Sequence, residues 1–300
     1  MTSVDEVLSA EHPAFARAVR AIVGGEVAAL AAELAADPAL VHARSASPHR
    51  ATLLHYIAAN GIEDALQRPV PESVALARTL LAAGAEVDAT CHAYEGRYPT
   101  TLSLLVSSDH PARAGVAAAL VDVLCQAGAA VDGLGGDRLP VSTSLLFGRI
   151  ECFDALIAHG ARVDNPVFAA AADRLDWVVR WLAADPALGT APCPTFPLEA
   201  DRAGLAEQAL VFASLCGRLE VVRLLLDRGT RIDAMPPGSH WTATALHAAA
   251  GQGHVAVVEL LLARGADASI RDARYQSTAL GWAQHNGSDD VIALLTELAL

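Results

Sequence analysis

The chain has 300 residues, 53% of them apolar, and its formal net charge is −13. This length and apolar content allow a large buried core and argue against a disordered chain. The acidic balance produces a potential that repels phosphate backbones and anionic lipid headgroups, so neither nucleic acid nor a membrane surface is an expected partner. No apolar run approaches the roughly 18 residues that a membrane-spanning helix requires.

The cysteines and histidines predict no disulfide framework and no metal or cofactor site. The cysteines are scattered and contain no C-x-x-C pair, which is typical of a reducing compartment and predicts a cytoplasmic protein; they are Cys91, Cys125, Cys152, Cys193 and Cys216. No two of the 11 histidines have the i, i+4 spacing of a helical metal site. The start "MTSVDEVLSAEHPAF" lacks the basic residues and apolar run of a signal peptide.

Taken in chain order, leucine- and valine-rich helices recur, each closed by glycine and a short polar turn. The turns are "GAEVDA" from Gly84, "GAAVDG" from Gly128, "GARVDN" from Gly160, "GTRIDA" from Gly229 and "GADASI" from Gly265. Their spacings are 44, 32, 69 and 36 residues. "LAADPAL" occurs from Leu34 and again from Leu182, and it takes the place of the glycine turn. The chain therefore repeats a unit of about 33 residues.

We expect seven to eight such units: 13–45, 50–91, 99–134, 140–166, 167–190, 205–235, 242–270 and 277–300. In each, a short alanine-rich helix precedes a longer one such as "VAVVELLLARG", whose apolar residues recur at helical spacing. Glycine provides the left-handed residue that ends the longer helix. Neither helix buries its apolar stripe alone, so the units must stack into an all-α solenoid.

The stretch "TALHAAAGQGHVAVVELLLARGADASIRD" resembles the ankyrin repeat, which carries T-P-L-H-x-A-A, G-H, V-V-x-L-L and G-A-x. The resemblance is strongest over 242–270, and the period extends it over most of the chain. It implies a single ankyrin-repeat domain, 1–300, with long finger loops. An alternative division into sub-blocks 1–189 and 205–300 places the proline-rich segment between them.

The resemblance implies different roles for neighbouring residues of the first helices. Thr52 with His55, and Thr244 with His247, match the threonine and histidine that bond to backbone within and between ankyrin repeats. Positions that face the concave groove or its edge correspond to Tyr56, Asn60, Leu104, Phe212 and Trp282. Aromatic side chains there are suited to anchoring a partner.

The joining loops are the second predicted recognition surface, because long loops on a rigid stack change without disturbing the core. They are "TCHAYEGRYPT" from Thr90, "GLGGDRLP" from Gly133, "GTAPCPTFPLEADRAG" from Gly189 and "AMPPGSHW" from Ala234. Their candidate binding residues are His92, Tyr94, Tyr98, Phe196, His240 and Trp241. Two insertions inside adjacent units, 62–73 and 107–115, are expected to form one surface carrying Arg68, Asp109, His110 and Arg113.

Three functions remain open from the sequence. The leading one is a non-catalytic module that binds a protein partner through the groove and finger loops, as most ankyrin proteins do. The alternative is an enzyme or small-molecule binder, with His92, Tyr94 and His110 as candidate catalytic residues beside Tyr56 and Asn60. A third is self-association through the apolar end at Leu298 and Leu300, although a monomer is the preferred interpretation. No known catalytic signature supports an enzyme.

Overall fold

The computed structural model describes residues 4–58, 62, 64–94, 99–236 and 242–297. Within these ranges the chain is helical without a strand, and its β-type pairings are two isolated bridges, Arg44 with Thr52 and Thr90 with Thr100. The predicted all-α class is therefore confirmed. The chain divides into two compact units, Met1–Ala161 and Arg162–Leu300.

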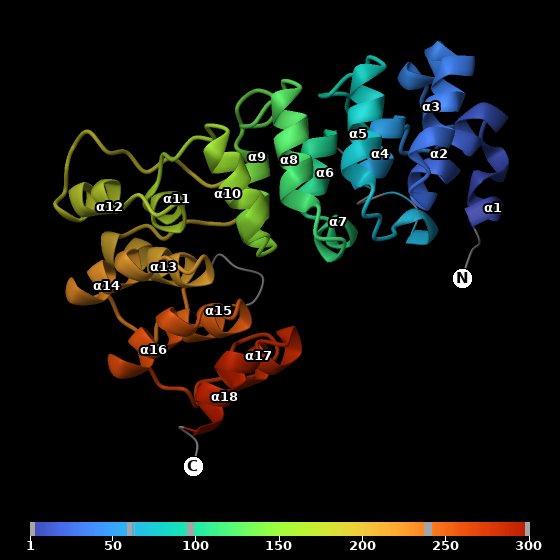
Figure 1. The fold of residues 1–300 in the computed structure, drawn as a ribbon. Helices are drawn as coiled ribbons and strands as arrows, with labels where there is room; N and C mark the ends of the chain where they lie inside the picture. Colours follow the sequence, from blue (N-terminus) through green and yellow to red (C-terminus); the bar gives the residue numbers. More distant parts are fainter. Residues whose placement is uncertain (1–3, 59–61, 63, 95–98, 237–241, 298–300) are drawn as a thin grey trace. The chain divides into compact units, whose positions relative to one another are not determined.

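The first unit consists of helix pairs preceded by a short N-terminal segment (Figure 1). The pairs are α2 (Pro13–Gly24) with α3 (Val27–Ala36), α4 (Leu53–Ala58) with α5 (Ser73–Ala82), α6 (Thr101–Leu105) with α8 (Ala117–Gln126), and α9 (Leu139–Leu146) with α10 (Ile150–Ala158). The shorter elements are α1 (Val4–Val7), η1 (Leu8–Ala10), η2 (Pro38–His42), η3 (Asp64–Leu66) and α7 (Asp109–Arg113). First helices pack on first helices and second helices on second helices, as in a solenoid.

The second unit repeats the same arrangement. Its pairs are α11 (Pro166–Ala171) with α12 (Leu175–Leu182), α13 (Arg202–Leu215) with α14 (Leu219–Asp227), α15 (Ala245–Gly251) with α16 (Val255–Ala263), and α17 (Ala279–Asn286) with α18 (Asp289–Glu297). The units expected at 140–166 and 167–190, which lack the histidine motif, each contain a helix pair. The expected sub-blocks, 1–189 and 205–300, remain a prediction.

The helix boundaries follow from a few residue types. Thr244 and Thr278 begin α15 and α17, where their hydroxyls accept hydrogen bonds from backbone N–H groups three residues further on. The predicted glycines end the second helices with positive φ angles: Gly84 at 98°, Gly128 at 94°, Gly160 at 90°, Gly229 at 83° and Gly265 at 88°. Only glycine adopts this left-handed conformation without strain. The prediction that glycine stops these helices is confirmed.

Both copies of "LAADPAL" also close a helix, as expected. Asp37 and Asp185 each accept a hydrogen bond from the backbone N–H two residues on, at 3.2 and 2.9 Å. In the second copy Ala184 occupies the left-handed conformation, with φ at 62°, where five of the other units have glycine. A β-carbon in that conformation is strained, so this turn is less favourable than its counterparts.

Small residues let the first helices approach one another closely. Every residue of α11 and α15 is buried, and both helices are rich in alanine. A β-carbon on Gly251 would lie 3.0 Å from Cε3 of Trp282 on α17. The alanine-rich first helices are therefore closely packed in each unit. The loops that join successive helix pairs begin at the C-terminal ends of the second helices. We use the name finger loops for four of these joining segments: 83–100, 127–138, 228–244 and 264–278. The proline-rich segment between α12 and α13 is not one of them.

Candidate functional site

The threonine and histidine pairs of the first helices have the structural role that the sequence predicts. Oγ1 of Thr52 lies 2.8 Å from Nδ1 of His55, and Thr244 and His247 repeat that distance. Nε2 of His247 lies 3.1 Å from the carbonyl oxygen of Ser277, in the next finger loop. Burial lowers the pKa of His55 to about 4, so its ring is neutral at pH 7. These histidines hold backbone in place.

The predicted aromatic groove residues are mostly covered by other parts of the chain. Tyr56 is 3% exposed and packs edge-on against Phe15 of α2 and His49, with centroids 6.0 and 6.1 Å away. Phe212 is 2% exposed because Phe196, which we expected on a free loop, stacks on it. Leu104 is also buried. The expectation that these side chains present an open surface is wrong in this structure.

Trp282 differs from the other aromatic groove candidates because it stays partly exposed. Its Nε1 donates to Oδ2 of Asp272 at 3.1 Å, and its ring meets the edge of His247 at 5.6 Å. Asn60, Tyr98, His240 and Trp241, also predicted as binding residues, lie outside the described residues. The same holds for Leu298 and Leu300.

The loop after α5 places two candidates at the surface. His92 is exposed and Tyr94 is 43% exposed. The base of the loop is closed by the N–H of Cys91, which donates to the carbonyl of Pro99 at 3.0 Å, and the N–H of His92 donates to the carbonyl of His49 at 2.6 Å. Partial burial of the Tyr94 side chain raises its pKa. His92 and Tyr94 therefore lie on a loop whose base is closed by backbone hydrogen bonds.

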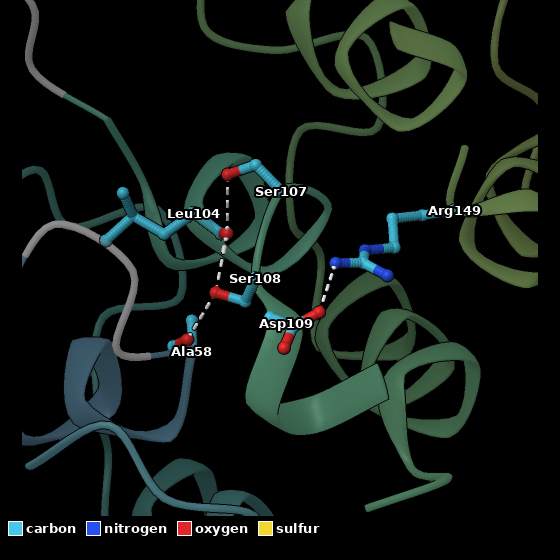
Figure 2. A network of polar contacts seen from close by, with 6 residues as sticks. All are labelled: Ala58, Leu104, Ser107, Ser108, Asp109 and Arg149. Carbon is cyan, nitrogen blue, oxygen red and sulfur yellow. Dashed lines mark hydrogen bonds and ion pairs between the residues drawn. The ribbon is translucent and has the colours of Figure 1, made fainter. Parts of the chain in front are cut away.

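The second insertion forms α7. Ser108 and Asp109, at the start of α7, form hydrogen bonds with two neighbouring helix pairs (Figure 2). Oγ of Ser108 donates to the carbonyl oxygens of Ala58, at 2.5 Å, and Leu104, at 3.0 Å. Oδ1 of Asp109 accepts from Nη2 of Arg149 at 2.8 Å. Ser108 therefore links α7 to the end of α4, the helix that precedes the first insertion in the chain.

Only part of the expected insertion surface is accessible. Arg68, Asp109 and Arg113 are exposed, but His110 is buried. Burial lowers the pKa of His110 to about 4, against smaller opposing effects of the Ala58 carbonyl and Asp109. His110 therefore lies in a different environment from the exposed His92 and Tyr94, with which it was grouped as a catalytic candidate.

The exposed apolar side chains reveal a pattern that the sequence reasoning missed. Seven large apolar residues are exposed among those that the structure describes, and four lie in finger loops: Tyr94, Leu134, Met235 and Tyr275. They occupy two matched positions. Tyr94 and Tyr275 stand ten residues after the glycine that ends a second helix, and Leu134 and Met235 stand six residues after it. Tyr94 was already a candidate, and counting from each glycine would have found Leu134, Met235 and Tyr275.

The last finger loop holds its tyrosine on a fixed backbone. Asp272 is fully buried, and its carboxylate accepts from the N–H groups of Arg274, Tyr275 and Ser277 at 2.9, 2.5 and 2.9 Å. Burial alone raises the pKa of Asp272, but these bonds and the one from Trp282 outweigh it and leave the pKa below its usual value. Tyr275 is 63% exposed, and the guanidinium of Arg274 lies 5.5 Å from its ring centroid.

The comparisons with known proteins each cover only a part of the chain. Residues 210–299 match the family described as ankyrin repeats, in three copies. Ankyrin repeats are present there. A 64-residue stretch is 44% identical to the palmitoyltransferase Hip14 of Drosophila melanogaster; it makes up 21% of this chain and 10% of that protein. The match thus spans about one tenth of the relative. No helix among the described residues is long and apolar enough to cross a membrane.

Proposed function

We propose that the whole chain is a non-catalytic ankyrin-repeat module, built from the eight helix pairs, that binds a protein partner through its finger loops and groove. Ankyrin repeats in general mediate interactions between proteins. The observation that carries the proposal is the concentration of exposed apolar side chains at two matched positions of the finger loops. Exposed aromatic residues on a fixed backbone anchor interfaces at low entropic cost.

The candidate residues that remain accessible define the proposed interface. In the first unit they are His92, Tyr94 and Leu134, and in the second they are Met235, Tyr275 and Trp282. Asn60, Tyr98, His240 and Trp241 are also proposed on the basis of the sequence. His110 contributes indirectly because it anchors α7, and Tyr56 contributes indirectly because it supports α4 from within the core. We propose a monomer that uses no cofactor.

The cysteines support the proposed cytoplasmic location. None of the five forms a disulfide in the structure. Burial raises the pKa of Cys125 to about 11 and that of Cys152 to about 12, so these thiols stay protonated and unreactive at pH 7. A reducing compartment is the environment that keeps such thiols free.

Alanine substitutions test the proposal with a matched control inside the same unit. Tyr94 and Phe147 are both aromatic and both 43% exposed, but Phe147 lies at the turn between α9 and α10, at the other end of the helix pairs. A partner retained by the wild-type protein during native purification is identified by mass spectrometry, and its affinity is then measured. We expect Tyr94→Ala or Tyr275→Ala to weaken binding by about tenfold or more, and Phe147→Ala to leave it unchanged.

Equal affinities for all three variants would contradict the proposed interface. Retention of a small molecule and no protein would instead favour the alternative of a ligand-binding or catalytic protein.

A further inference from the structure

The proline-rich segment between α12 and α13 is docked on α13 by one aromatic ring and one amide side chain. The ring of Phe196 stacks on that of Phe212, with centroids 5.0 Å apart and planes 13° apart. Gln208 lies one helical turn before Phe212, so the two side chains share one face of α13. Oε1 of Gln208 accepts from the N–H of Glu199 at 2.8 Å, and its Nε2 donates to the carbonyl of Pro197 at 2.9 Å.

This arrangement has the form of peptide recognition. The amide of Gln208 satisfies a donor and an acceptor of the main chain, so it recognises an extended backbone whatever side chains that backbone carries. Gln208 is fully buried under the segment. Phe196 provides the anchor, and the prolines of "APCPTFPLEA" favour the extended conformation that such sites bind.

The apolar burial of the segment is concentrated at Phe196, while at its start the N–H of Ala191 donates to the carbonyl of Asp164 at 3.0 Å. Phe196 is the buried member of residues 191–200, and the others are half-buried or exposed. The described residues of the segment form no helix or strand (Figure 1). A segment with few buried apolar contacts opens at lower free energy than the helices beneath it. Its release would uncover Phe212 and Gln208 together on α13.

We propose that the Gln208 and Phe212 face of α13 is a peptide-binding site, and that residues 192–199 are its resident internal ligand. A partner segment of the same chemistry displaces them: an extended, proline-flanked peptide with one aromatic anchor. The internal segment then acts as a competitive inhibitor built into the chain. This site is separate from the finger loops, so the inference does not rest on the interface proposed there.

Gly204 provides a way to open the site. A β-carbon at Gly204 would lie 2.7 Å from Cβ and Cγ of Glu199, so Gly204→Ala pushes the segment away while it favours the helix itself. Glu199→Gly removes those atoms, and the double variant Gly204→Ala/Glu199→Gly should close again. Hydrogen exchange at the amide of residue 199 reports opening, because that N–H donates to Gln208. We expect faster exchange in Gly204→Ala and wild-type protection in the double variant.

Binding in trans is measured with a labelled peptide, APSPTFPLGA. It reproduces residues 191–200 with serine for the cysteine and glycine for Glu199, which avoids the clash with Ala at 204. A tethered segment competes at an effective concentration in the millimolar range, so the wild-type site is blocked. By fluorescence anisotropy we expect Gly204→Ala to bind the peptide about tenfold more tightly than the wild type. Phe196→Ala serves as a second opened variant.

The controls separate this site from general opening and from the finger loops. Gln208→Ala in the Gly204→Ala background, or alanine at the phenylalanine of the peptide, should abolish the gain. Tyr94→Ala and Tyr275→Ala should leave peptide binding unchanged, whatever they do to the partner of the finger loops. The proposal is overturned if the peptide binds the wild type and both opened variants with equal affinity, or if the gain survives the loss of Gln208.

Discussion

Asp272 is the residue whose loss should most disturb the last finger loop. Asp272→Asn keeps the size of the side chain but replaces one acceptor oxygen by an NH₂ group. Two of the four donors that now reach the carboxylate would then face another donor. These donors are the N–H groups of Arg274, Tyr275 and Ser277 and Nε1 of Trp282. A hydrogen bond to a buried charged group contributes about 1.5–3 kcal/mol, so we expect a loss of about 3 kcal/mol in the free energy of unfolding.

The assay is urea unfolding followed by tryptophan fluorescence. All four tryptophans lie in the second compact unit, so the signal reports that unit. A loss of about 3 kcal/mol lowers the urea midpoint by on the order of 1 M. Asp227→Asn is the control, because Asp227 is exposed and pairs with Arg264 on the surface, where such pairs contribute at most about 1 kcal/mol. A shift for Asp272→Asn no larger than that of the control would refute the reasoning.

The pH dependence of stability provides a second test of the substitution Asp272→Asn. The pKa of Asp272 is lower in the folded state than in the unfolded chain, where it is about 3.9. The stabilisation by its carboxylate is therefore complete above the unfolded pKa and is lost as the pH falls through the folded pKa. The urea midpoint of the wild type should fall below about pH 5, and this part of the fall should be absent in Asp272→Asn.

Two further predictions concern the strained turn and the buried histidine. Ala184→Gly should raise the stability of the second unit by about 1 kcal/mol in the same urea assay, because the left-handed φ of 62° strains alanine; a destabilised variant would contradict this. His110 has a pKa of about 4 in the folded state and about 6.5 when unfolded, so its contribution is complete above pH 6.5 and is lost towards pH 4. His110→Gln should therefore remove roughly 2–3 kcal/mol of the pH dependence of first-unit stability between those values, measured by circular dichroism, and an unchanged profile would refute the assignment.

The parts of the fold that depend on local patterns were predictable from the sequence. Gly84, Gly128 and Gly265 mark the ends of second helices because only glycine adopts their left-handed conformation without strain. Thr244 and His247 predict the start of α15 because the cap and the ring bond lie within one helical turn. Each of these features is decided by residues close to one another in the chain.

The accessibility of the candidate site residues was not predictable in the same way. Tyr56 and Phe212 occupy positions that face outward in a regular repeat, but Phe15 of α2 covers one and Phe196 of the proline-rich segment covers the other. The repeat period carries no information about a segment that folds back on the stack. Tyr94 was a candidate from the sequence, whereas its correspondence with Tyr275 required counting from each glycine.

The central claim is that the finger loops contact a protein, and site-specific photo-crosslinking tests it most directly. A photoreactive phenylalanine derivative is placed at Tyr94 or Tyr275, and at Phe147 or Val179 as exposed apolar positions outside the finger loops. The account predicts that one protein is crosslinked from positions 94 and 275 and not from positions 147 and 179. A protein crosslinked equally from all four positions, or only from 147 and 179, would contradict the account.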